Sequence, residues 1–471
     1  MRLVLGAVLS LFALCAASNQ QSVCIVGSGV GGSSTAFRLR QLLEQGGAKD
    51  TTEIHVFEQT GIVGGRVAVF DHHGQTIEAG GTVFLTNNRY MMEYADLLDL
   101  PLRKPGDLLA ANPQMGIFNG EEILFETNAN SWYTTLKLLW RYGPFSLNAF
   151  QRIVKHLVDQ FNRIYDIQLK GHAFTDPVDL LHAIKLYDLT QTTLEQVLLK
   201  GGVSPKLINE LLAGITRVNY GQNTTMTALA GAVGLAGSGD DLRTVVGGNF
   251  QVPKGLLHRA RAEVHFNTTV KAVRSGFTVD TSKGEFTCTA VVIATPLELT
   301  DIALPVEVPK RPFQTTHTAF VEGVLNAAKF GAASASDLPG GILTIELESL
   351  VFSSMGLQYD RPGRPPLYKV FSRKPWTADL AQEWFVDGKI VRQFPWRAYP
   401  TYQAPEIIPK FELAPGLFYV NAIESAASAM EISAVGGRNV ALLVKTFLSS
   451  QAAAPTKPDA SSESAASKDE L

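Results

Sequence analysis

Ser22-Val-Cys-Ile-Val26, a short β-branched run, leads directly into Gly27-Ser-Gly29-Val-Gly31-Gly32. Residues 33–45 then carry apolar side chains at helical spacing, and Glu53-Ile-His-Val-Phe57 has the composition of a second strand, which ends at Glu58. The order of strand, G-x-G-x-x-G, helix, strand and acidic residue predicts a Rossmann-like βαβ unit. The expected fold class is therefore α/β.

The residues of this motif have separate expected tasks at a dinucleotide. Gly27 permits the tight turn after the strand, Gly29 lets the backbone approach a pyrophosphate, and Gly32 lets the helix and the strand pack closely. The N-terminus of the helix offers free N–H groups and a partial positive charge to the phosphates. Glu58 is placed to accept hydrogen bonds from a ribose diol. We predict these four residues to bind the cofactor.

The residues after Glu58 narrow the choice of cofactor. Gly64-Gly65-Arg66 follows closely, and Glu78-Ala-Gly80-Gly81 comes next. This pattern resembles the glutathione-reductase-like FAD-binding superfamily, particularly its amine-oxidase-like branch, where a GG-R segment runs along the pyrophosphate and the flavin edge. The resemblance implies FAD as the cofactor, with Gly64, Gly65 and Arg66 beside it and Arg66 offsetting phosphate charge.

Three later segments resemble further parts of that superfamily. Residues 264–270 have the pattern of one strand, and Val270 matches a valine that contacts the adenine through its backbone. Residues 290–296 resemble the strand and turn that return to the nucleotide. Residues 416–424 run strand-like into a small-residue segment, where the superfamily has a strand, Gly-Asp and a helix facing the flavin. Glu424 stands in place of that Asp, and the resemblance implies that its carboxylate reaches the ribityl hydroxyls.

The composition limits the class of protein. The chain has 471 residues, 45% of them hydrophobic and 18% charged, which is typical of a globular protein with more than one domain. A net charge of −3 leaves no basic excess for phosphates, which argues against nucleic-acid binding. Three cysteines and nine scattered histidines show no metal-ligand spacing, so no metal is expected. A Cys24–Cys288 disulfide is an open option, since sequence cannot supply the required geometry.

Both ends of the chain carry targeting signals. Residues 1–18 have the charged start, apolar run and small residues of a cleaved signal peptide, and residues 468–471 are Lys-Asp-Glu-Leu. The expected location is the endoplasmic reticulum lumen, with the KDEL receptor as a partner and the lysosome or another secretory compartment as the alternative. No further long apolar run predicts a transmembrane segment in the mature chain. Sequons make Asn223 and Asn267 candidate glycosylation sites.

The cofactor segments lie far apart in the chain, so the FAD-binding domain is expected to be discontinuous, with an inserted α+β substrate domain. The expected divisions are a signal peptide at 1–18, the FAD-binding domain at 19–90, 241–300 and 411–450, the substrate domain at 91–240 and 301–410, and a flexible tail ending in KDEL at 451–471.

The substrate side gives weaker signals. Residues 131–166 are rich in Leu, Trp, Phe and Ile, and three interpretations stay open: core helices, the wall of an apolar tunnel, or a face for peripheral membrane contact. Arg217, Tyr220 and Gln222 form a polar cluster that we predict to bind substrate, Arg217 through a carboxylate. The alternative is a buried structural network. No Ser/His/Asp spacing identifies catalytic residues, and these stay unknown.

Segments spread over most of the chain together resemble the prenylcysteine oxidase (prenylcysteine lyase) family. They are Trp140-Arg-Tyr-Gly143, Arg217-Val-Asn-Tyr-Gly-Gln222, Ala294-Thr-Pro-Leu297, Ala398-Tyr-Pro400 and Ile423-Glu-Ser-Ala-Ala-Ser-Ala-Met-Glu431. The resemblance implies an FAD-dependent oxidase that uses O2 and water to cleave farnesyl- or geranylgeranyl-L-cysteine from degraded prenylated proteins. The products are cysteine, an isoprenoid aldehyde and hydrogen peroxide. The alternatives are another FAD-dependent amine or lipid oxidase, and a non-catalytic prenyl-binding protein of related fold.

Overall fold

The computed structural model describes residues 21–45, 51–107, 114–237 and 241–453. The predicted signal peptide at 1–18 and the KDEL ending at 468–471 lie outside the described residues, as does most of the predicted tail. Among the described helices, none combines the length and the apolar character needed to cross a bilayer.

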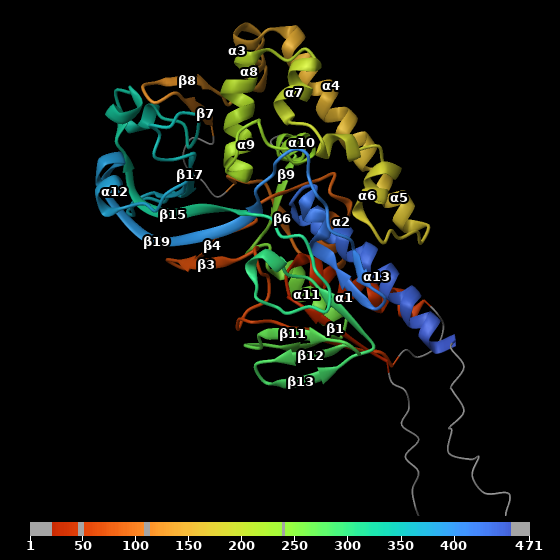
Figure 1. The fold of residues 1–471 in the computed structure, drawn as a ribbon. Coiled ribbons are helices and arrows are strands. Elements are labelled where there is room, and N and C mark those ends of the chain that lie inside the picture. Colours follow the sequence, from red (N-terminus) through yellow and green to blue (C-terminus); the bar gives the residue numbers. More distant parts are fainter. Residues whose placement is uncertain (1–20, 46–50, 108–113, 238–240, 454–471) are drawn as a thin grey trace, which may run out of the picture.

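A six-stranded sheet with the order β10-β2-β1-β14-β21-β20 forms the lower part of the molecule in Figure 1. Its central strand β1 (Ser22–Val26) pairs in parallel with β2 (Glu53–Phe57) and β14 (Ala290–Ile293), and both β1 and β14 are almost fully buried. Burial on both faces explains the β-branched runs at these positions. The remaining strands are β10 (Glu263–His265) and β21 (Leu417–Tyr419), both parallel, and β20 (Glu412–Ala414), which is antiparallel.

Four helices accompany this sheet: α1 (Val30–Glu44), α2 (Arg89–Leu97), α11 (Gln251–Arg259) and α13 (Met430–Ala453). Helices α1 and α13 pack so closely that a Cβ on Gly437 would lie 2.7 Å from the carbonyl oxygen of Gly31. A disulfide joins Cys24 in β1 to Cys288 just before β14, with the two Cα atoms 5.9 Å apart. The pairing that the sequence left open is therefore present.

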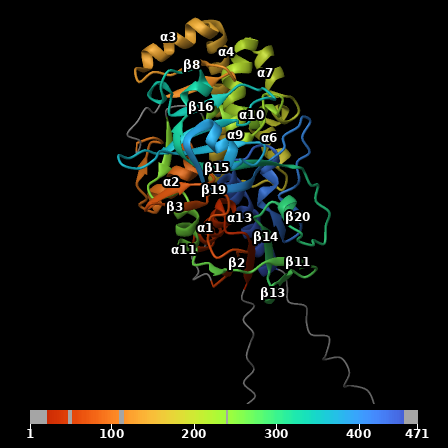
Figure 2. The same cartoon turned by 90° about the vertical axis from the view of Figure 1, so that its left-hand side faces the viewer.

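A second, seven-stranded sheet carries the substrate side, and its order is β19-β15-β18-β17-β16-β7-β8. Its strands are β7 (Met115–Phe118), β8 (Ile123–Glu126), β15 (Phe313–Leu325), β16 (Gly341–Thr344), β17 (Ser354–Tyr359), β18 (Leu367–Ser372) and β19 (Phe385–Pro400). The accompanying helices are α3 (Ser131–Tyr142), α4 (Pro144–Phe161), α5 (Arg163–Leu169), α6 (Pro177–Ala183), α7 (Leu194–Lys200), α8 (Pro205–Leu207), α9 (Ala213–Tyr220) and α10 (Ala228–Ala236). Figure 2 shows α3 at the end of the molecule opposite to the six-stranded sheet.

Smaller elements complete the structure. They are the hairpin β3 (Val69–His72) and β4 (Gln75–Glu78), the sheet of β5 (Phe84–Leu85), β9 (Leu242–Val245) and β6 (Leu102–Arg103), the sheet of β11 (Val270–Arg274), β12 (Thr278–Thr281) and β13 (Gly284–Thr287), and helix α12 (Ala378–Trp384). A Rossmann-like α/β part with an inserted α+β part is the architecture that the sequence predicts.

Two predicted elements are corrected by the structure. The single strand expected at residues 264–270 is two strands, β10 and β11, which belong to different sheets and are separated by a turn with φ +51° at Asn267. The strand expected at residues 416–424 stops at Tyr419 and continues as a 3₁₀ helix, η6 (Val420–Ser425). The long C-terminal helix α13 therefore begins only at Met430.

Candidate functional site

A cavity of about 1140 Å³ lies between the cofactor side and the substrate side of the molecule. One wall contains the loop at 27–31, Glu58 at the end of β2, residues 64–67 and the first turn of α13. The other wall comes from helices α4, α9 and α10 and from strands β16 to β19. Segments that are far apart in the sequence thus line one shared cavity.

The glycine-rich loop shows three different packing situations. A Cβ on Gly32 would lie 2.1 Å from the carbonyl oxygen of Gly27, so α1 packs this closely on the loop only without a side chain. Gly27 has φ +107°, and a Cβ there would lie 2.8 Å from the carbonyl oxygen of Ala294. Gly29 has an ordinary φ of −71°, and a Cβ would meet nothing nearer than Gly64 O at 3.8 Å. The protein itself does not require glycine at position 29, which leaves the close approach of a ligand as the reason.

Glu58 is held at the edge of the cavity beside this loop. Its carboxylate accepts hydrogen bonds from Ser28 N at 3.2 Å, from Ser28 Oγ at 2.5 Å and from Thr60 N at 2.9 Å. Val270, the first residue of β11, also lines the cavity. Both residues thus lie at the cavity, and their roles in cofactor binding stay predictions.

Arg66 and Glu424 are brought together by the fold. Gly64 and Gly65 have φ of +132° and +56°, and this turn carries Arg66 to the cavity wall. The Arg66 guanidinium forms an ion pair with Glu424 and donates to the carbonyl oxygen of Ala398 at 2.9 Å. Glu424 lies on η6, is only 1% exposed and does not line the cavity. The sequence assigned the two residues to phosphates and to the ribityl chain, and it missed this pairing.

The residues that are present fit an FAD molecule. Within the described part of the chain, η6 carries three buried polar atoms without a hydrogen-bond partner: Asn421 Oδ1, Glu424 Oε2 and Ser425 Oγ. Unpartnered buried polar groups are costly, and Asn421 faces the cavity, so a polar ligand would satisfy it. The N-termini of α1 and α13 both lie at the cavity, where they favour negative charge such as a pyrophosphate.

The substrate-side wall is largely apolar. Helix α4 contributes Val154, Leu157, Val158 and Phe161, four side chains on successive turns. Further apolar side chains at the wall are Val218, Val233, Leu343, Met355 and Phe371. Such a surface suits a hydrocarbon chain better than a charged substrate. Of the three interpretations of residues 131–166, two are seen together: the segment packs into the main hydrophobic core, and α4 also lines the cavity. The face for membrane contact stays a prediction.

Lys369 on β18 places a buried cation in this wall. Its Nζ donates to the carbonyl oxygen of Glu78 at 3.1 Å and to Thr82 Oγ1 at 3.3 Å, two uncharged partners. Burial lowers the pKa of the Lys369 ammonium to about 8, against the attraction of the Glu78 carboxylate. Sequence reasoning missed this residue, because a lone lysine in a strand gives no sign of burial.

The comparisons with known proteins fit this geometry. The prenylcysteine lyase family matches residues 125–455, and a Rossmann-like NAD(P)-binding domain family matches residues 25–98. Farnesylcysteine lyase of Arabidopsis thaliana is 36% identical over 449 residues, which cover 91% of this chain and 89% of that protein. The chain belongs to the prenylcysteine lyase family. Human prenylcysteine oxidase 1 is 33% identical over 458 residues, covering 89% of this chain and 88% of that protein.

A solved structure supports the fold of this prenylcysteine lyase family member. Cyclohexylamine oxidase from Brevibacterium oxydans superposes with a TM-score of 0.60 at 16% identity, covering 91% of this chain and 100% of that one. The predicted family and the predicted Rossmann-like fold are confirmed. The comparisons also agree with the predicted enzyme class, an FAD-dependent oxidoreductase.

Arg217, the residue predicted to bind a substrate carboxylate, lies in a buried network away from the cavity. The side chain is 2% exposed and does not line the cavity. Its guanidinium donates to Thr344 O at 2.9 Å and to Thr344 Oγ1 at 2.7 Å, and its Nε lies 3.3 Å from Glu346 Oε2. These contacts tie α9 to the end of β16. The structure therefore places Arg217 in a buried structural network, which was the alternative interpretation, and not at a substrate carboxylate.

Of the other two residues of that predicted cluster, Tyr220 lies at the cavity and Gln222 does not. Tyr220 lines the cavity and donates its hydroxyl to Ser428 O at 2.8 Å. Gln222 exchanges two hydrogen bonds with the backbone of Tyr402, at 3.0 and 2.8 Å, and does not line the cavity. A substrate-binding role for Tyr220 stays a prediction.

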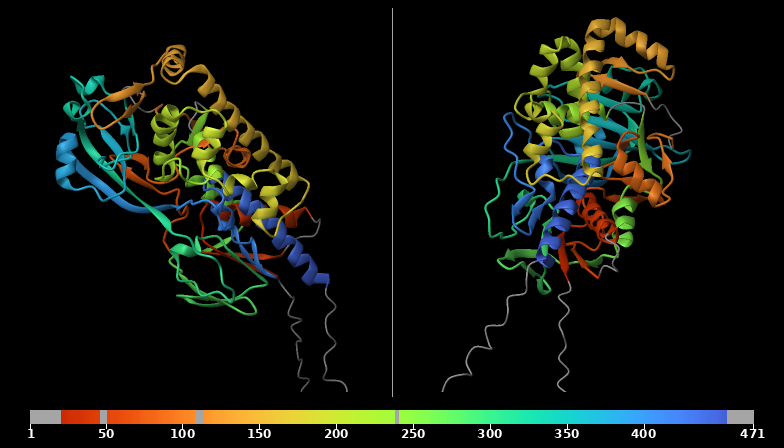
Figure 3. Two further views of the ribbon diagram at one scale, coloured as in Figure 1. Left: turned by 45° about the horizontal axis from the view of Figure 1, so that its top comes forward. Right: turned by 90° about the vertical axis from the view of Figure 1, so that its right-hand side faces the viewer.

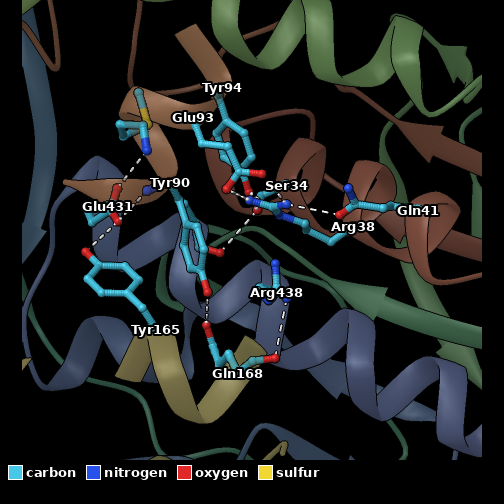
Figure 4. A network of polar contacts seen from close by, with 12 residues as sticks. Ser34, Arg38, Gln41, Tyr90, Glu93, Tyr94, Tyr165, Gln168, Glu431 and Arg438 are labelled. Carbon is cyan, nitrogen blue, oxygen red and sulfur yellow. Dashed lines mark hydrogen bonds and ion pairs between the residues drawn. The ribbon is translucent and has the colours of Figure 1, made fainter. Parts of the chain in front are cut away.

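A buried polar network positions the N-terminus of α13 (Figure 4). The Glu431 carboxylate accepts from Tyr90 N and Met91 N, both at 2.9 Å, and from the Tyr165 hydroxyl at 2.7 Å. Burial raises the pKa of Glu431, while the three donors oppose that shift. Behind it, Arg38 forms a charge-assisted bond with Glu93 at 2.5 Å. The network fixes the start of α13 against α2, at the cavity.

Among the described residues, two groups of His and Glu side chains with closely spaced potential metal-ligand atoms lie outside the cavity. His55, Glu263 and His265 form one, and His72, His73 and Glu322 form the other, each with its potential ligand atoms within 4.8 Å of one another. The prediction that the protein uses no metal therefore stays a prediction.

Proposed function

We propose that this protein is an FAD-dependent prenylcysteine oxidase that cleaves the thioether of farnesyl- or geranylgeranyl-L-cysteine. O2 and water are consumed, and cysteine, an isoprenoid aldehyde and hydrogen peroxide are released. The observation that carries the proposal is the cavity that joins the nucleotide motif at 27–58 to an apolar wall. The names of the relatives, farnesylcysteine lyase and prenylcysteine oxidase, support the choice of substrate.

The two walls of the cavity have different roles in the proposed reaction. When bound, FAD supplies an acceptor for the hydride that leaves C1, a carbon where the neighbouring double bond and sulfur stabilise positive charge. The apolar side chains of α4, together with Met355 on β17, hold the isoprenoid and keep bulk water away from it. Lys369 holds a positive charge at the cavity wall beside residues 80–82, from which it would stabilise negative charge on FAD bound in the cavity.

Anaerobic addition of farnesylcysteine to the purified protein tests the proposal. We expect the protein to be yellow, its visible flavin bands to bleach on mixing, and the bands to return with hydrogen peroxide when air is admitted. The matched control is farnesol, which has the chain but no thioether. A yellow protein that bleaches only with amines or other lipids would identify a different oxidase. A colourless protein that binds farnesylcysteine would support the non-catalytic prenyl carrier instead.

The proposed location is the endoplasmic reticulum lumen, with retention through the KDEL receptor. The signal-like residues 1–18 and the KDEL ending at 468–471 support it, and so does the Cys24–Cys288 disulfide, which is typical of oxidising compartments. Asn267 is exposed at the turn before β11, so it is the better of the two candidate glycosylation sites. Asn223 is half-buried, and its Oδ1 accepts from Thr225 N at 3.0 Å.

Glycan analysis in expressing cells tests this location. We expect endoglycosidase H to increase the gel mobility of the protein, and Asn267→Gln to remove that shift. Asn223→Gln is the matched control and is expected to keep it. Deletion of residues 468–471 is expected to send the protein into the medium. Accumulation of the intact chain in lysosomes, with glycans resistant to the enzyme, would contradict the proposal.

A further inference from the structure

The joint between α3 and α4 exposes an unusual number of large apolar side chains. Trp140 is 89% exposed, Phe145 is 88% exposed and Trp132 is 61% exposed. We call this surface the aromatic tip, and it consists of Trp132, Tyr133, Leu136, Trp140 and Phe145. Single exposed apolar residues are common on proteins, but a cluster of this kind marks a contact site.

Helix geometry explains how α3 presents these residues. At about 100° per residue, Trp132, Leu136 and Trp140 fall on one side of the helix, and Tyr133 falls next to them. Leu138 lies away from this side and packs against the hydrophobic core. Helix α3 is therefore apolar on two faces, of which the protein covers one. The exposed face has no partner among the described residues.

The charged residues of the segment that carries the aromatic tip are all basic. Residues 127–158 contain no Asp or Glu but carry Lys137, Arg141, Arg152 and Lys155, although the whole chain has a net charge of −3. Glu210 pairs with Arg141, and Asp159 pairs with Lys155. Arg152 is exposed, and Lys137 lies 5.2 Å from the centre of the Tyr133 ring. Basic side chains beside exposed aromatic ones suit an anionic lipid surface.

The aromatic tip is also connected to the cavity. Helix α4 begins beside it at Pro144, and its later turns supply Val154, Leu157 and Phe161 to the cavity wall. Figure 3 shows α4 as one long helix that runs from the joint with α3 toward α13. The aromatic tip lies at the end of the molecule far from the six-stranded sheet (Figure 2). A surface that binds the aromatic tip would thus lie at the start of α4, the helix whose later turns line the cavity.

We propose that the aromatic tip docks the protein peripherally on an anionic phospholipid surface. The aromatic side chains enter the headgroup region, and Lys137 and Arg152 contact lipid phosphates. This docking goes beyond the proposed function and does not depend on which substrate the cavity takes.

Vesicle co-sedimentation of the FAD-loaded protein tests the docking. The probes are vesicles of phosphatidylcholine alone and vesicles in which about one lipid in three is the anionic phosphatidylserine. We expect stronger binding to the anionic vesicles, weakening as salt is added, and a blue shift of tryptophan fluorescence on binding. In the double variant Trp140→Ser/Phe145→Ser we expect the affinity for anionic vesicles to fall roughly tenfold or more.

The matched control is Val386→Ser/Ile407→Ser, two residues that are 55% and 70% exposed but lie outside the aromatic tip. It is expected to bind vesicles like the unmodified protein. Both double variants are expected to keep turnover of prenylcysteine in solution, since none of these four residues lines the cavity. Equal vesicle binding by all three proteins would overturn the docking proposal. So would a dimer of the unmodified protein that dissociates in Trp140→Ser/Phe145→Ser, because the tip would then be a contact between copies.

Discussion

Replacing Lys369 with methionine is expected to lower the turnover of prenylcysteine by about 100- to 1000-fold while FAD stays bound. The reason is that a positive charge held in place at the cavity wall stabilises negative charge that develops during the reaction. Methionine keeps most of the length and apolar stem of lysine, so the packing against Phe371 and Phe320 is largely retained. The measurements are the rate of anaerobic flavin bleaching and the flavin absorbance per protein. Lys389→Met, at an exposed lysine on β19, is the matched control.

The pH dependence separates this role from a structural one. Burial lowers the pKa of Lys369 from 10.5 to about 8, so the ammonium loses its charge as the pH rises through about 8. The bleaching rate is expected to fall across that range in the unmodified protein and to show no such step in Lys369→Met. Between about pH 8 and 10.5 the unfolded chain keeps a proton that the folded chain has lost, so this group contributes stability that rises with pH.

It follows that burying the charged ammonium of Lys369 lowers the stability of the folded protein below about pH 8. The free energy of unfolding of Lys369→Met should therefore be no lower than that of the unmodified protein. A charge that is retained in a cavity at the expense of stability is typical of functional sites. A Lys369→Met protein that bleaches at the normal rate with an unchanged pH profile would remove Lys369 from the reaction.

The second large effect is expected from two glycines that look equivalent in the sequence. Gly29→Ala should leave the folding of the FAD-free protein unchanged, since the new Cβ would meet no atom nearer than 3.8 Å. It should nevertheless weaken FAD binding by about 100-fold, because the methyl group holds the pyrophosphate away from the backbone N–H groups. Gly32→Ala should lower the melting temperature even without FAD, because its Cβ would lie 2.1 Å from Gly27 O.

Flavin titration and thermal unfolding of the FAD-free proteins distinguish the two effects. Gly61→Ala is the matched control: its Cβ would meet only the Asn267 side chain, at 3.6 Å, and both measurements should stay unchanged. If Gly29→Ala bound FAD with normal affinity, the pyrophosphate would not approach the loop at this residue.

The parts of the fold that sequence could predict are those with local signals. The β-branched run of β1 leads directly into the glycines at 27–32, and the acidic end of β2 follows within the same βαβ unit, so the sequence predicts all three. The division of residues 264–270 into two strands was missed, because the turn uses Asn267 at positive φ and no glycine marks it. Asparagine tolerates that conformation without changing the strand-like composition around it.

The site residues that sequence missed depend on contacts between distant segments. Arg66 meets Glu424 across 358 positions, and Lys369 meets residues 78 and 82 across nearly 300. Arg217 was recognised as a polar residue in apolar surroundings, but only the fold supplies Thr344 and Glu346 as its partners. Residue type and spacing give the kind of chemistry, whereas the burial and pairing of a charge need the assembled structure.

The strand order β10-β2-β1-β14-β21-β20 has a consequence for biosynthesis. While the ribosome is still translating the substrate side, β1 and β2 of the nascent chain have neither β14 nor β21 beside them. The nucleotide site closes only after α13 has been synthesised, so the unfinished chain must be kept from aggregating until almost its last codons are read. A premature stop codon before residue 430 therefore yields a polypeptide with the strands of both sheets and the apolar wall. It lacks α13, so its nucleotide site is incomplete.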